Sequence, residues 1–560
     1  MISDIEFINS DQVKNSINKL TDNIRAEKNS SDSYLRIFAD PAIIDRLKNR
    51  NNQIVYGRRG SGKTHLLLAL AEKIEEENTE DNKIIPIYID LRAILPLLTE
   101  EDTSKIEASV LIFQHIVNII IETLADSIKY IFDIGDIYNK STLEIHKKNQ
   151  ISIALESLNY AIEGNTISKL GEISFSKEEV NKISGSLQAS KNPSLTANAE
   201  NENKSTHSSA NIKYISFGDI SKSLAQLMKN LNDVKVICLL DEWSELPIKL
   251  QPYVSELIKR AFISTQFSFK IAAIPYRSKF RDIISDDYKI GLEEGGDVFA
   301  IHIDNRYIFE IDKIATRDFY NELLYKHMYE IDSELYKDVD QRKYINIFFA
   351  NQALSEILIA SAGIPRDFMH LFILSYGLRT NFKKRIILKN IRSATTEWYH
   401  SDKKEEIEKD QPIRTLFEAI VDKIVIEKEK THFLMPQKYS ENRHIKKLVD
   451  LRALHIRQKG ISHKHFSNKI YDAYSIDYGS YTSIDIQKRQ LDTDFINLKT
   501  IENVRDARSI SLEDEFFEKH ILNIGEGIKC PKCSRIVDTN HLAYTKQNLC
   551  NHCFEKVIID

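Results

Sequence analysis

The chain is 560 residues long, which is enough for three or four domains of ordinary size. Hydrophobic residues make up 42% of the sequence and charged residues 28%, with only 17 Gly and 11 Pro, so the composition excludes a fibrous or largely disordered protein. The formal net charge is −5, so a basic region is a local departure from a slightly acidic chain.

The N-terminal sequence MISDIEFINSDQVKN lacks a positively charged start followed by an apolar segment, so we expect no secretory signal and a cytoplasmic location. The most apolar stretch, residues 108–121, contains Gln114, His115 and Asn118. It is also shorter than the about 20 residues that a membrane span requires. We therefore expect a buried helix there and no association with a membrane.

Four short apolar runs rich in β-branched residues alternate with helical patterns, which favours the buried parallel strands of an α/β sheet. They cover residues 52–57, 83–91, 235–241 and 269–275. Between the second and third runs, residues 174–209 are polar and nearly free of aromatic side chains, which predicts a flexible surface insertion. After residue 312 the pattern is predominantly helical to about residue 410.

The first strand leads into a glycine-rich motif. Residues 57–64, GRRGSGKT, fit the pattern G-x-x-x-x-G-K-[ST] and precede the helical stretch HLLLALAEKIEEE. In such a P-loop, backbone N–H groups surround a phosphate and the start of the following helix adds a favourable dipole. The motif predicts ATP contacts from Gly57, Gly60, Ser61, Gly62, Lys63 and Thr64, with Lys63 on the β- and γ-phosphates and Thr64 on Mg²⁺. The alternative is a glycine-rich turn that binds no nucleotide.

The third strand ends in two carboxylates, Asp241 and Glu242, after the apolar run KVICLL. This arrangement predicts that Asp241 holds Mg²⁺ and that Glu242 activates the attacking water as general base. No N-K-x-D guanine-specificity motif occurs in the sequence, which favours ATP over GTP. The alternative is a strand that ends in a solvated acidic turn.

These two motifs resemble those of the AAA+ superfamily, in particular its origin-recognition and initiator-like branch and related bacterial P-loop ATPases, over about residues 35–490. The stretch SAGIPRDF at 361–368 is similar to the sensor 2 segment of that branch. The resemblance implies that Arg366 touches the γ-phosphate from a lid helix and so takes part in catalysis with Lys63, Asp241 and Glu242. An ordinary surface ion pair is the alternative for Arg366.

The resemblance also implies a small polar sensor 1 residue after the fourth strand, for which Ser278 and Arg277 are the candidates. An arginine finger that acts on a neighbouring subunit is expected further on, and Arg281 is the best candidate. Such proteins work as assemblies, so we expect a homo-oligomer.

Residues 411–490 follow the order helix, short strand, basic helix and β-like segments, which resembles the winged-helix domain of initiator-type AAA+ proteins. The segment contains 15 Lys and Arg against 9 Asp and Glu, and local basicity of this kind is typical of a nucleic-acid module. In the basic helix, expected over 441–455, Arg443, Lys446 and Lys447 point outward and are candidates for phosphate contacts with DNA. The alternative is a solvated helix face.

The C-terminus contains two CxxC pairs, Cys530 with Cys533 and Cys550 with Cys553, separated by sixteen residues. This spacing predicts a structural Cys₄ Zn²⁺ site in a ribbon whose folding depends on the metal. Free or redox-active cysteines are the alternative, and His552 is expected to be a bystander.

The predicted fold is therefore an α/β P-loop AAA+ domain with a parallel sheet, a helical lid, a winged-helix-like domain and a small Cys₄ zinc ribbon. The expected parts are an N-terminal segment 1–34, an ATPase domain 35–311 with a helical excursion 92–173 and the insertion 174–209, a lid 312–410, a winged helix 411–490, a linker 491–525 and the ribbon 526–560.

Two functions fit these motifs. One is an ATPase that couples ATP binding and hydrolysis to DNA association or remodelling. The other is a nucleotide-gated switch in signalling or anti-phage defence that controls a protein partner through the ribbon or the insertion.

Overall fold

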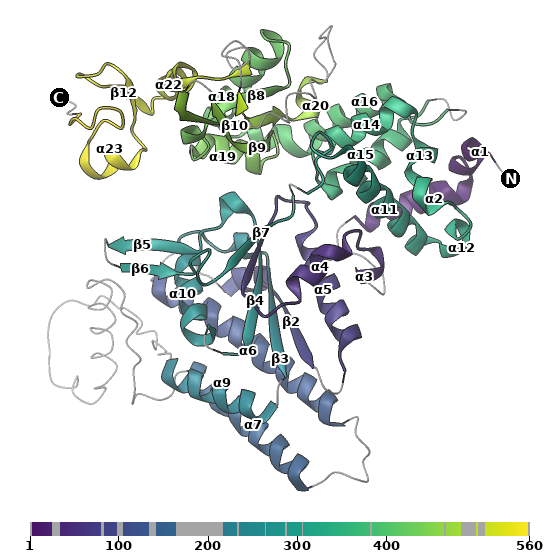
Figure 1. Cartoon of the computed structure of the whole chain (residues 1–560), viewed down its shortest axis with the longest axis vertical. Helices are drawn as coiled ribbons and strands as arrows, with labels where there is room; N and C mark the ends of the chain where they lie inside the picture. The colour runs from purple at the N-terminus through teal and green to yellow at the C-terminus, as the bar shows by residue number, and fades with distance from the viewer. Residues whose placement is uncertain are drawn as a thin grey trace, which may run out of the picture. The chain divides into compact units, whose positions relative to one another are not determined.

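The structure is a computed structural model with two compact units, which are described separately (Figure 1). The sheet unit comprises residues 32–57 and 63–303, and the helical unit comprises residues 1–31, 58–62 and 304–560. The described residues are 3–24, 34–79, 83–97, 105–133, 142–163, 217–231, 234–263, 265–285, 288–304, 306–380, 384–463, 466–482, 500–501 and 510–557. The predicted insertion 174–209 lies outside them.

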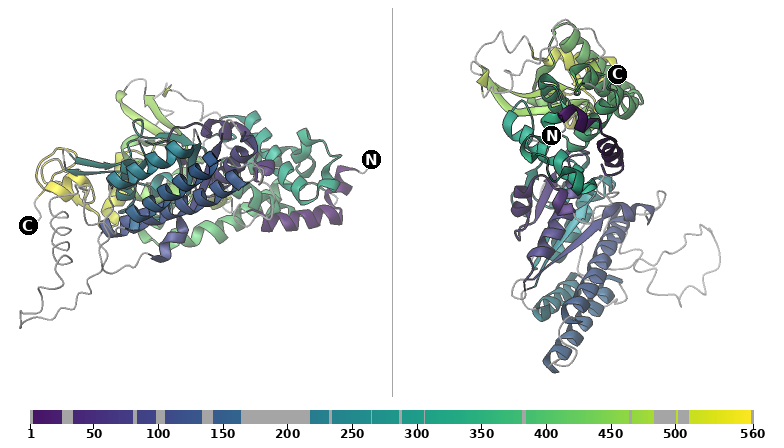
Figure 2. Two further views of the ribbon diagram at one scale, coloured as in Figure 1. Left: turned by 90° about the horizontal axis from the view of Figure 1, so that it is seen from below. Right: turned by 90° about the vertical axis from the view of Figure 1, so that its right-hand side faces the viewer.

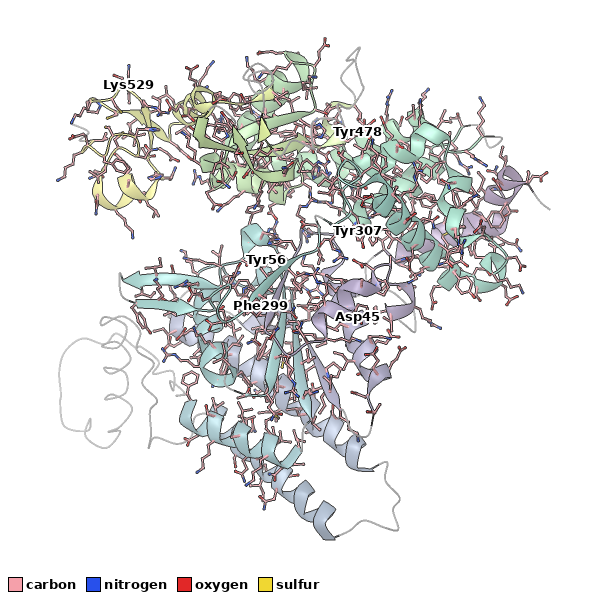
Figure 3. All side chains as sticks on the ribbon, viewed as in Figure 1. Asp45, Tyr56, Phe299, Tyr307, Tyr478 and Lys529 are labelled. Atoms are coloured by element: carbon pink, nitrogen blue, oxygen red, sulfur yellow. The ribbon has the colours of Figure 1, made fainter. Side chains whose placement is uncertain are left out.

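The sheet unit is built on five parallel strands in the order β2-β3-β4-β1-β7 (Figure 1). They are β1 (Gln53–Tyr56), β2 (Ile84–Asp90), β3 (Lys235–Asp241), β4 (Phe267–Ala273) and β7 (Phe299–His302). The first four confirm the strands that the four apolar runs of the sequence predict. The sequence pattern missed β7, an edge strand of four residues in which only Ile301 is buried. Figure 3 labels Tyr56 and Phe299, which lie on the adjacent strands β1 and β7.

Alternating side chains of the strands enter two separate cores, because successive residues of a strand point to opposite faces. Val55, Ile237 and Leu239 pack on one face with helices α4 (Pro41–Leu47) and α5 (Lys63–Glu77). Ile54 and Cys238 pack on the other face. The core on that face also contains side chains of α6 (Lys105–Asp133), α7 (Thr142–Glu163), α9 (Phe217–Leu231) and α10 (Gln251–Phe262), which Figure 2 draws in blue to teal. The sheet unit is therefore a three-layer α/β/α sandwich, which confirms the predicted α/β domain with a parallel sheet.

Helix α6 contains the apolar stretch of the sequence. Its segment Lys105–Ser127 has a mean hydropathy of 1.6, so by length and composition alone it could cross a membrane. Phe113, Ile116 and Ile120 are nevertheless fully buried against the sheet. This burial confirms the prediction of a core helix.

The sheet unit also contains a short helix and a β-hairpin. Helix α3 (Tyr34–Ile37) precedes α4 and contacts α5, and strands β5 (Arg281–Ser285) and β6 (Tyr288–Gly291) form an antiparallel hairpin after β4.

The helical unit begins with α1 (Asp4–Ile8) and α2 (Asp11–Asp22), which pack on helices that follow residue 312. The hydroxyl of Tyr376 donates to the carbonyl of Ile8 at 2.6 Å and ties the two segments together. The later helices are α11 (Lys313–Ile331), α12 (Ser333–Tyr336), α13 (Tyr344–Phe348), α14 (Asn351–Ala360), α15 (Pro365–Gly377), α16 (Leu388–Tyr399) and α17 (Glu405–Glu408). They agree with the helical pattern predicted for this part of the chain.

The next module has the element order expected of a winged helix. It consists of α18 (Gln411–Val421), β8 (His432–Pro436), α19 (Arg443–Asp450), β9 (Leu454–His463), β10 (Phe466–Ile476), α20 (Tyr478–Tyr481) and β11 (Thr500–Ile501). The strand order is β11-β9-β10-β8. The basic helix is shorter than the predicted 441–455, because Arg452 adopts a left-handed φ of 60° that ends the helix, and β9 begins two residues later.

The C-terminal part contains α22 (Asp514–Asn523), which lies within the predicted linker, and a small hairpin. The hairpin strands β12 (Gly527–Lys529) and β13 (Ile536–Asp538) pair antiparallel, and α23 (Leu542–Gln547) follows. Val537 and Val557 pack against Cys530 and Cys550, so this core consists largely of the cysteine side chains themselves.

Candidate functional site

The P-loop follows the central strand β1 directly. Gly57 N still donates to Ala273 O of β4 at 3.1 Å, and the chain then turns before α5 begins at Lys63. Gly60 and Gly62 have φ values of +85° and +89°, a region that only glycine adopts without strain. Lys63 is 9% exposed and donates from Nζ to Gly57 O at 2.8 Å, so its ammonium group is held inside the loop.

Three further P-loop residues lie where the motif predicts. Ser61 has its hydroxyl buried without a hydrogen-bond partner among the described residues. Gly62 directly precedes α5, and Thr64 lies in the first turn of that helix and is half-buried. The N-terminal end of a helix dipole and a buried, unsatisfied hydroxyl are suited to an anionic ligand.

Within the helical unit, the tip of the P-loop touches the start of α15. Arg366 N donates to Gly60 O at 3.2 Å. A Cβ on Gly60 would lie 3.0 Å from both Cβ and Nε of Arg366, so the close approach needs glycine as well as its positive φ. Pro365 at the first helical turn and a left-handed turn at Ala362 and Gly363 fix the direction in which α15 starts.

Arg366 is half-buried, and its Nε is fully buried. Its Nε has no hydrogen-bond partner among the residues that the structure describes. Burial and then the charge of Arg452 lower the pKa of Arg366. An arginine with an unsatisfied buried N–H beside a P-loop glycine is suited to bind an anion.

The carboxylates of the second motif lie at the end of β3. Asp241 is fully buried, and its Oδ1 accepts from Glu242 N at 2.9 Å. Its Oδ2 accepts from the hydroxyl of Tyr88 on the neighbouring strand β2, also at 2.9 Å. Burial and the charge of Asp241 raise the pKa of Tyr88, so the phenol stays protonated and remains a donor. The contact of Tyr88 with Asp241 could not be predicted, because no local sequence motif links two residues so far apart in the chain.

Glu242 has a φ of 56°, a left-handed value that is uncommon for a residue other than glycine. Burial and the charge of Asp241 raise the pKa of Glu242, whereas the nearby cations Lys63 and Arg92 lower it. Arg92 Nη1 lies 3.9 Å from Glu242 Oε1, and the same guanidinium is bound to Asp90. Glu242 is thus a carboxylate with reduced acidity that faces two cations.

The sensor candidates lie after β4. Ser278 Oγ is 2.8 Å from Ser244 Oγ, and Ser244 Oγ also accepts from Ile274 N at 2.6 Å. Ser244 follows Glu242 by two residues, so both hydroxyls lie near the end of β3. Arg277 contributes its carbonyl to Gln251 Nε2 at 3.0 Å. Arg281, the candidate arginine finger, pairs within the chain with Glu293 at 2.6 Å.

The basic helix α19 presents its cations partly to neighbouring acids. Ile445, Leu448 and Val449 are buried, as the periodicity predicts. Lys446 pairs with Glu441, and Arg443 pairs with Glu526, which directly precedes the β12 hairpin. Lys447 is exposed. Two of the three candidate phosphate contacts are therefore already paired with carboxylates.

Helix α22 attaches the ribbon to this face of the winged-helix module. The rings of Tyr439 and Phe517 stack with their centroids 4.1 Å apart, and Lys438 Nζ lies 2.7 Å from Asp514 Oδ1. On the ribbon side, Arg535 pairs with Glu518 of the same helix.

The four C-terminal cysteines come together as predicted. Their sulfur atoms all lie within 4.8 Å of one another, with 3.7 Å between Cys530 and Cys553 and between Cys533 and Cys550. A tetrahedral ion with bonds of about 2.3 Å to sulfur would have S···S edges of about 3.8 Å. His552 lies outside the cluster and bonds to Ile536 O at 2.9 Å.

The two CxxC segments have the same local geometry. The N–H of Cys530 donates to Arg535 O at 2.9 Å, and that of Cys550 donates to Glu555 O at 2.8 Å. The residue that follows each second cysteine, Ser534 or Phe554, is left-handed. The chain thus forms two equivalent knuckles whose donor set fits one tetrahedral metal ion.

No curated protein matches this chain. Among solved structures, it is similar to the Aeropyrum pernix Orc1 protein in complex with DNA, with 11% identity and a TM-score of 0.29, over 81% of this chain and 97% of that one. It is also similar to Drosophila ORC bound to DNA, with 13% identity and a TM-score of 0.31, over 84% of this chain and 93% of that one. A family model described as ORC-CDC6-like matches residues 20–490, and the chain therefore belongs to the ORC-CDC6-like family.

Proposed function

We propose that this protein binds ATP with Mg²⁺ at residues 57–64 and hydrolyses it to ADP and phosphate. The observation that carries the proposal is the strand order β3-β4-β1. In this parallel sheet the P-loop and the pair Asp241 and Glu242 follow the carboxyl ends of strands that are separated only by β4. Ligands of α/β proteins bind at that edge of a sheet.

Thr64 and Asp241 would hold the Mg²⁺ ion, and their oxygen atoms suit this cation. When bound, the ion neutralises charge on the β- and γ-phosphates. Tyr88 orients Asp241 by donating to Oδ2, which fixes the carboxylate in one direction.

Glu242 would accept the proton of the attacking water. Its left-handed backbone and partial burial hold the carboxylate at the end of β3, and its raised pKa brings its basicity closer to what a general base needs near neutral pH. Lys63 and Arg366 would bind the phosphates, and the unsatisfied Nε of Arg366 supports this role.

We further propose that ATP turnover is coupled to DNA association through the winged-helix module. Support comes from the membership of the ORC-CDC6-like family and from the excess of cations in residues 411–490. Lys446 and Lys447 are the phosphate contacts expected on α19. Arg443 would join them only when Glu526 releases it.

A nucleotide-gated switch that acts on a protein partner is the second candidate. The Arg443–Glu526 pair favours it, because the ribbon segment already neutralises part of the basic helix. In either case the Cys₄ cluster would bind one Zn²⁺ ion, and four thiolates leave no open coordination position for catalysis.

The deciding experiment measures phosphate release by the full chain with and without single- and double-stranded DNA. DNA-stimulated turnover supports the coupled ATPase. Slow turnover that DNA leaves unchanged, together with no DNA affinity at low salt, supports the switch. Lys446→Ala with Lys447→Ala should lower the salt dependence of duplex binding by about two units in d log K/d log[salt] if both contact phosphates.

A further inference from the structure

The second residue of the P-loop motif, Arg58, is anchored in the helical unit. The motif allows any residue at this position, yet Arg58 is only 5% exposed. Its Nε donates to Asp304 Oδ2 at 2.9 Å and its Nη2 donates to Ala362 O at 3.0 Å. Its Nη1 lies 2.7 Å from Nδ1 of His455, on strand β9 of the winged-helix module. The loop is therefore held by side chains that lie hundreds of residues away in the sequence.

His455 uses both ring nitrogens. Because a guanidinium can only donate, Nδ1 accepts from Arg58, and Nε2 therefore carries the hydrogen and donates to Asp477 Oδ1 at 3.2 Å. Burial lowers the pKa of His455 to about 3, so the ring is neutral and the tautomer is the one that its two partners require.

The contacts continue from Asp477 to the helix that carries Arg366. Lys403 donates to Asp477 and lies 3.7 Å from Asp367 Oδ2. Asp367 is the neighbour of Arg366 on α15, and Arg366 N donates to Gly60 O. These buried groups therefore form a closed path of contacts. It runs from the P-loop to β9, called the wing strand below, and returns to the P-loop through α15.

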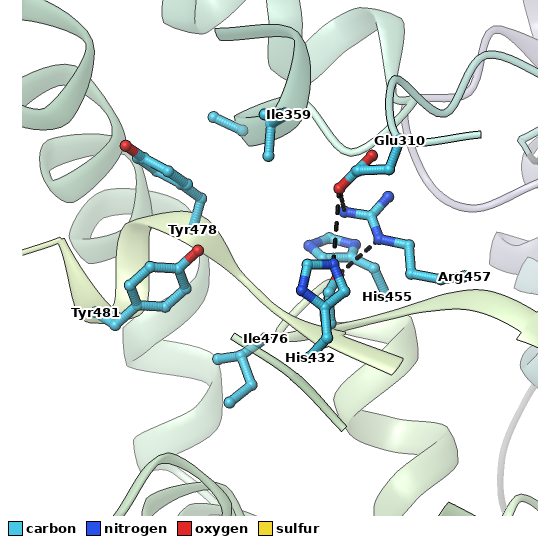
Figure 4. A pocket seen from close by; sticks show the side chains of 10 residues that line it. Glu310, Ile359, His432, His455, Arg457, Ile476, Tyr478 and Tyr481 are labelled. Carbon is cyan, nitrogen blue, oxygen red and sulfur yellow. Dashed lines mark hydrogen bonds and ion pairs between the residues drawn. The ribbon is translucent and has the colours of Figure 1, made fainter. Parts of the chain in front are cut away.

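The neighbouring part of β9 is held in the same way. Figure 4 shows His455 beside Arg457, which lies 3.2 Å from Glu310 and also donates to Ser475 at 2.7 Å. Burial opposes ionisation of Glu310, but Arg457 and His432 outweigh it and lower its pKa to about 2. The ion pair of Arg457 with Glu310 and its hydrogen bond to Ser475 thus hold β9, the strand that carries His455, in place.

We propose that His455 is a positioning residue for the P-loop: through Arg58 it holds residues 58–62 in the form that receives phosphate, so nucleotide affinity depends on the wing strand. The inference rests on the proposed ATP binding at residues 57–64. Linkage is reciprocal, so nucleotide binding must stabilise the wing strand by the same factor.

The test compares the full chain with two variants of His455 by titration with a fluorescent non-hydrolysable ATP analogue. In His455→Asn the side-chain oxygen can replace Nδ1 as the acceptor for Arg58. His455→Gln instead places its amide near Asp477 and leaves Arg58 without that acceptor. Loss of one hydrogen bond to a charged group predicts about tenfold weaker binding for His455→Gln, and binding within about twofold of wild type for His455→Asn.

A double-mutant cycle separates this role from a general loss of stability. Arg58→Gln combined with His455→Gln should bind the analogue no more weakly than Arg58→Gln alone, because both changes break the same contact. Effects that multiply, or a His455→Gln variant that binds as tightly as wild type, would overturn the inference while leaving ATP binding in place. No binding by the wild type itself would instead refute the proposed function and the inference with it.

A measurement on the wild type alone covers the case in which the variants fail to fold. The analogue should slow amide hydrogen exchange in β9 and β10 as well as in the P-loop and α5. Protection confined to residues 57–77 would contradict the inference.

Discussion

The hydroxyl of Tyr88 lies 2.9 Å from Asp241 Oδ2 and joins the ends of the neighbouring strands β2 and β3. The other oxygen of Asp241 accepts from the backbone of Glu242, so the carboxylate has one orientation before any ligand arrives. Outer contacts of this kind set the affinity of a carboxylate for a metal ion.

Tyr88→Phe should therefore raise the Mg²⁺ concentration required for half-maximal turnover by about tenfold or more, while nucleotide affinity without Mg²⁺ is unchanged. The matched control is Tyr56→Phe, since Tyr56 donates to Glu294 rather than to Asp241. An equal Mg²⁺ requirement in wild type and Tyr88→Phe would remove Tyr88 from this role.

The pH dependence of turnover should reveal the contact between Arg92 and Glu242. A general base loses activity as it becomes protonated, so turnover should fall as the pH drops through the raised pKa of Glu242. Arg92 lowers that pKa, so Arg92→Ala should move the acid limb of the profile to higher pH. Lys73→Ala, which removes a cation paired with Glu77, should leave the limb in place. A limb that does not move in Arg92→Ala would contradict the assignment.

Elemental analysis should find one zinc ion per chain. Cys530→Ser should lose it, because a thiolate is removed from the cluster, yet ATP binding should persist since the P-loop is far away in the chain. The fifth cysteine, Cys238, is buried in β3, so Cys238→Ala should keep the zinc. A metal-free wild type with a folded C-terminus would end this interpretation.

DNA affinity should respond to the pairing of Arg443 with Glu526. Glu526→Gln frees Arg443 for a phosphate, which predicts tighter binding and a salt dependence that is steeper by about 0.9 in d log K/d log[salt]. Glu515→Gln on α22 makes the same change in net charge at an exposed position and should leave the slope unchanged. If both variants gain affinity equally, net charge rather than release of Arg443 is responsible.

Most features that could be predicted from the sequence are local motifs, each contained in a short segment of the chain. The strands β1 and β3 are continuous apolar runs because both faces of the sheet are covered. The glycines that follow β1 mark the P-loop, and the acids at the end of β3 are Asp241 and Glu242. The knuckles were predictable for the same reason, since each is complete within six residues. Strand β7 could not be predicted in this way, because an exposed edge strand does not require an apolar run.

The contacts that position the site could not be predicted from the sequence. Tyr88 reaches Asp241 from 153 residues away, and Arg58 reaches His455 across 397 residues. Each side chain is unremarkable within its own segment and gains its role only when the sheet or the helical unit forms. The roles assigned to the P-loop residues, to Asp241 and Glu242, and to Arg366, Ser278 and Arg281 stay predictions.

The most direct test of ATP hydrolysis by Glu242 is phosphate release at saturating ATP and Mg²⁺ by the wild type and by Glu242→Gln, with nucleotide affinity measured in parallel. Lys63→Ala, which removes the proposed phosphate contact, should abolish binding, and Glu245→Gln serves as the control for an acid outside the motif. We predict that Glu242→Gln binds ATP as tightly as the wild type but releases no phosphate, because an amide cannot accept the proton of water. Wild-type turnover by Glu242→Gln, or unchanged affinity in Lys63→Ala, would contradict the account.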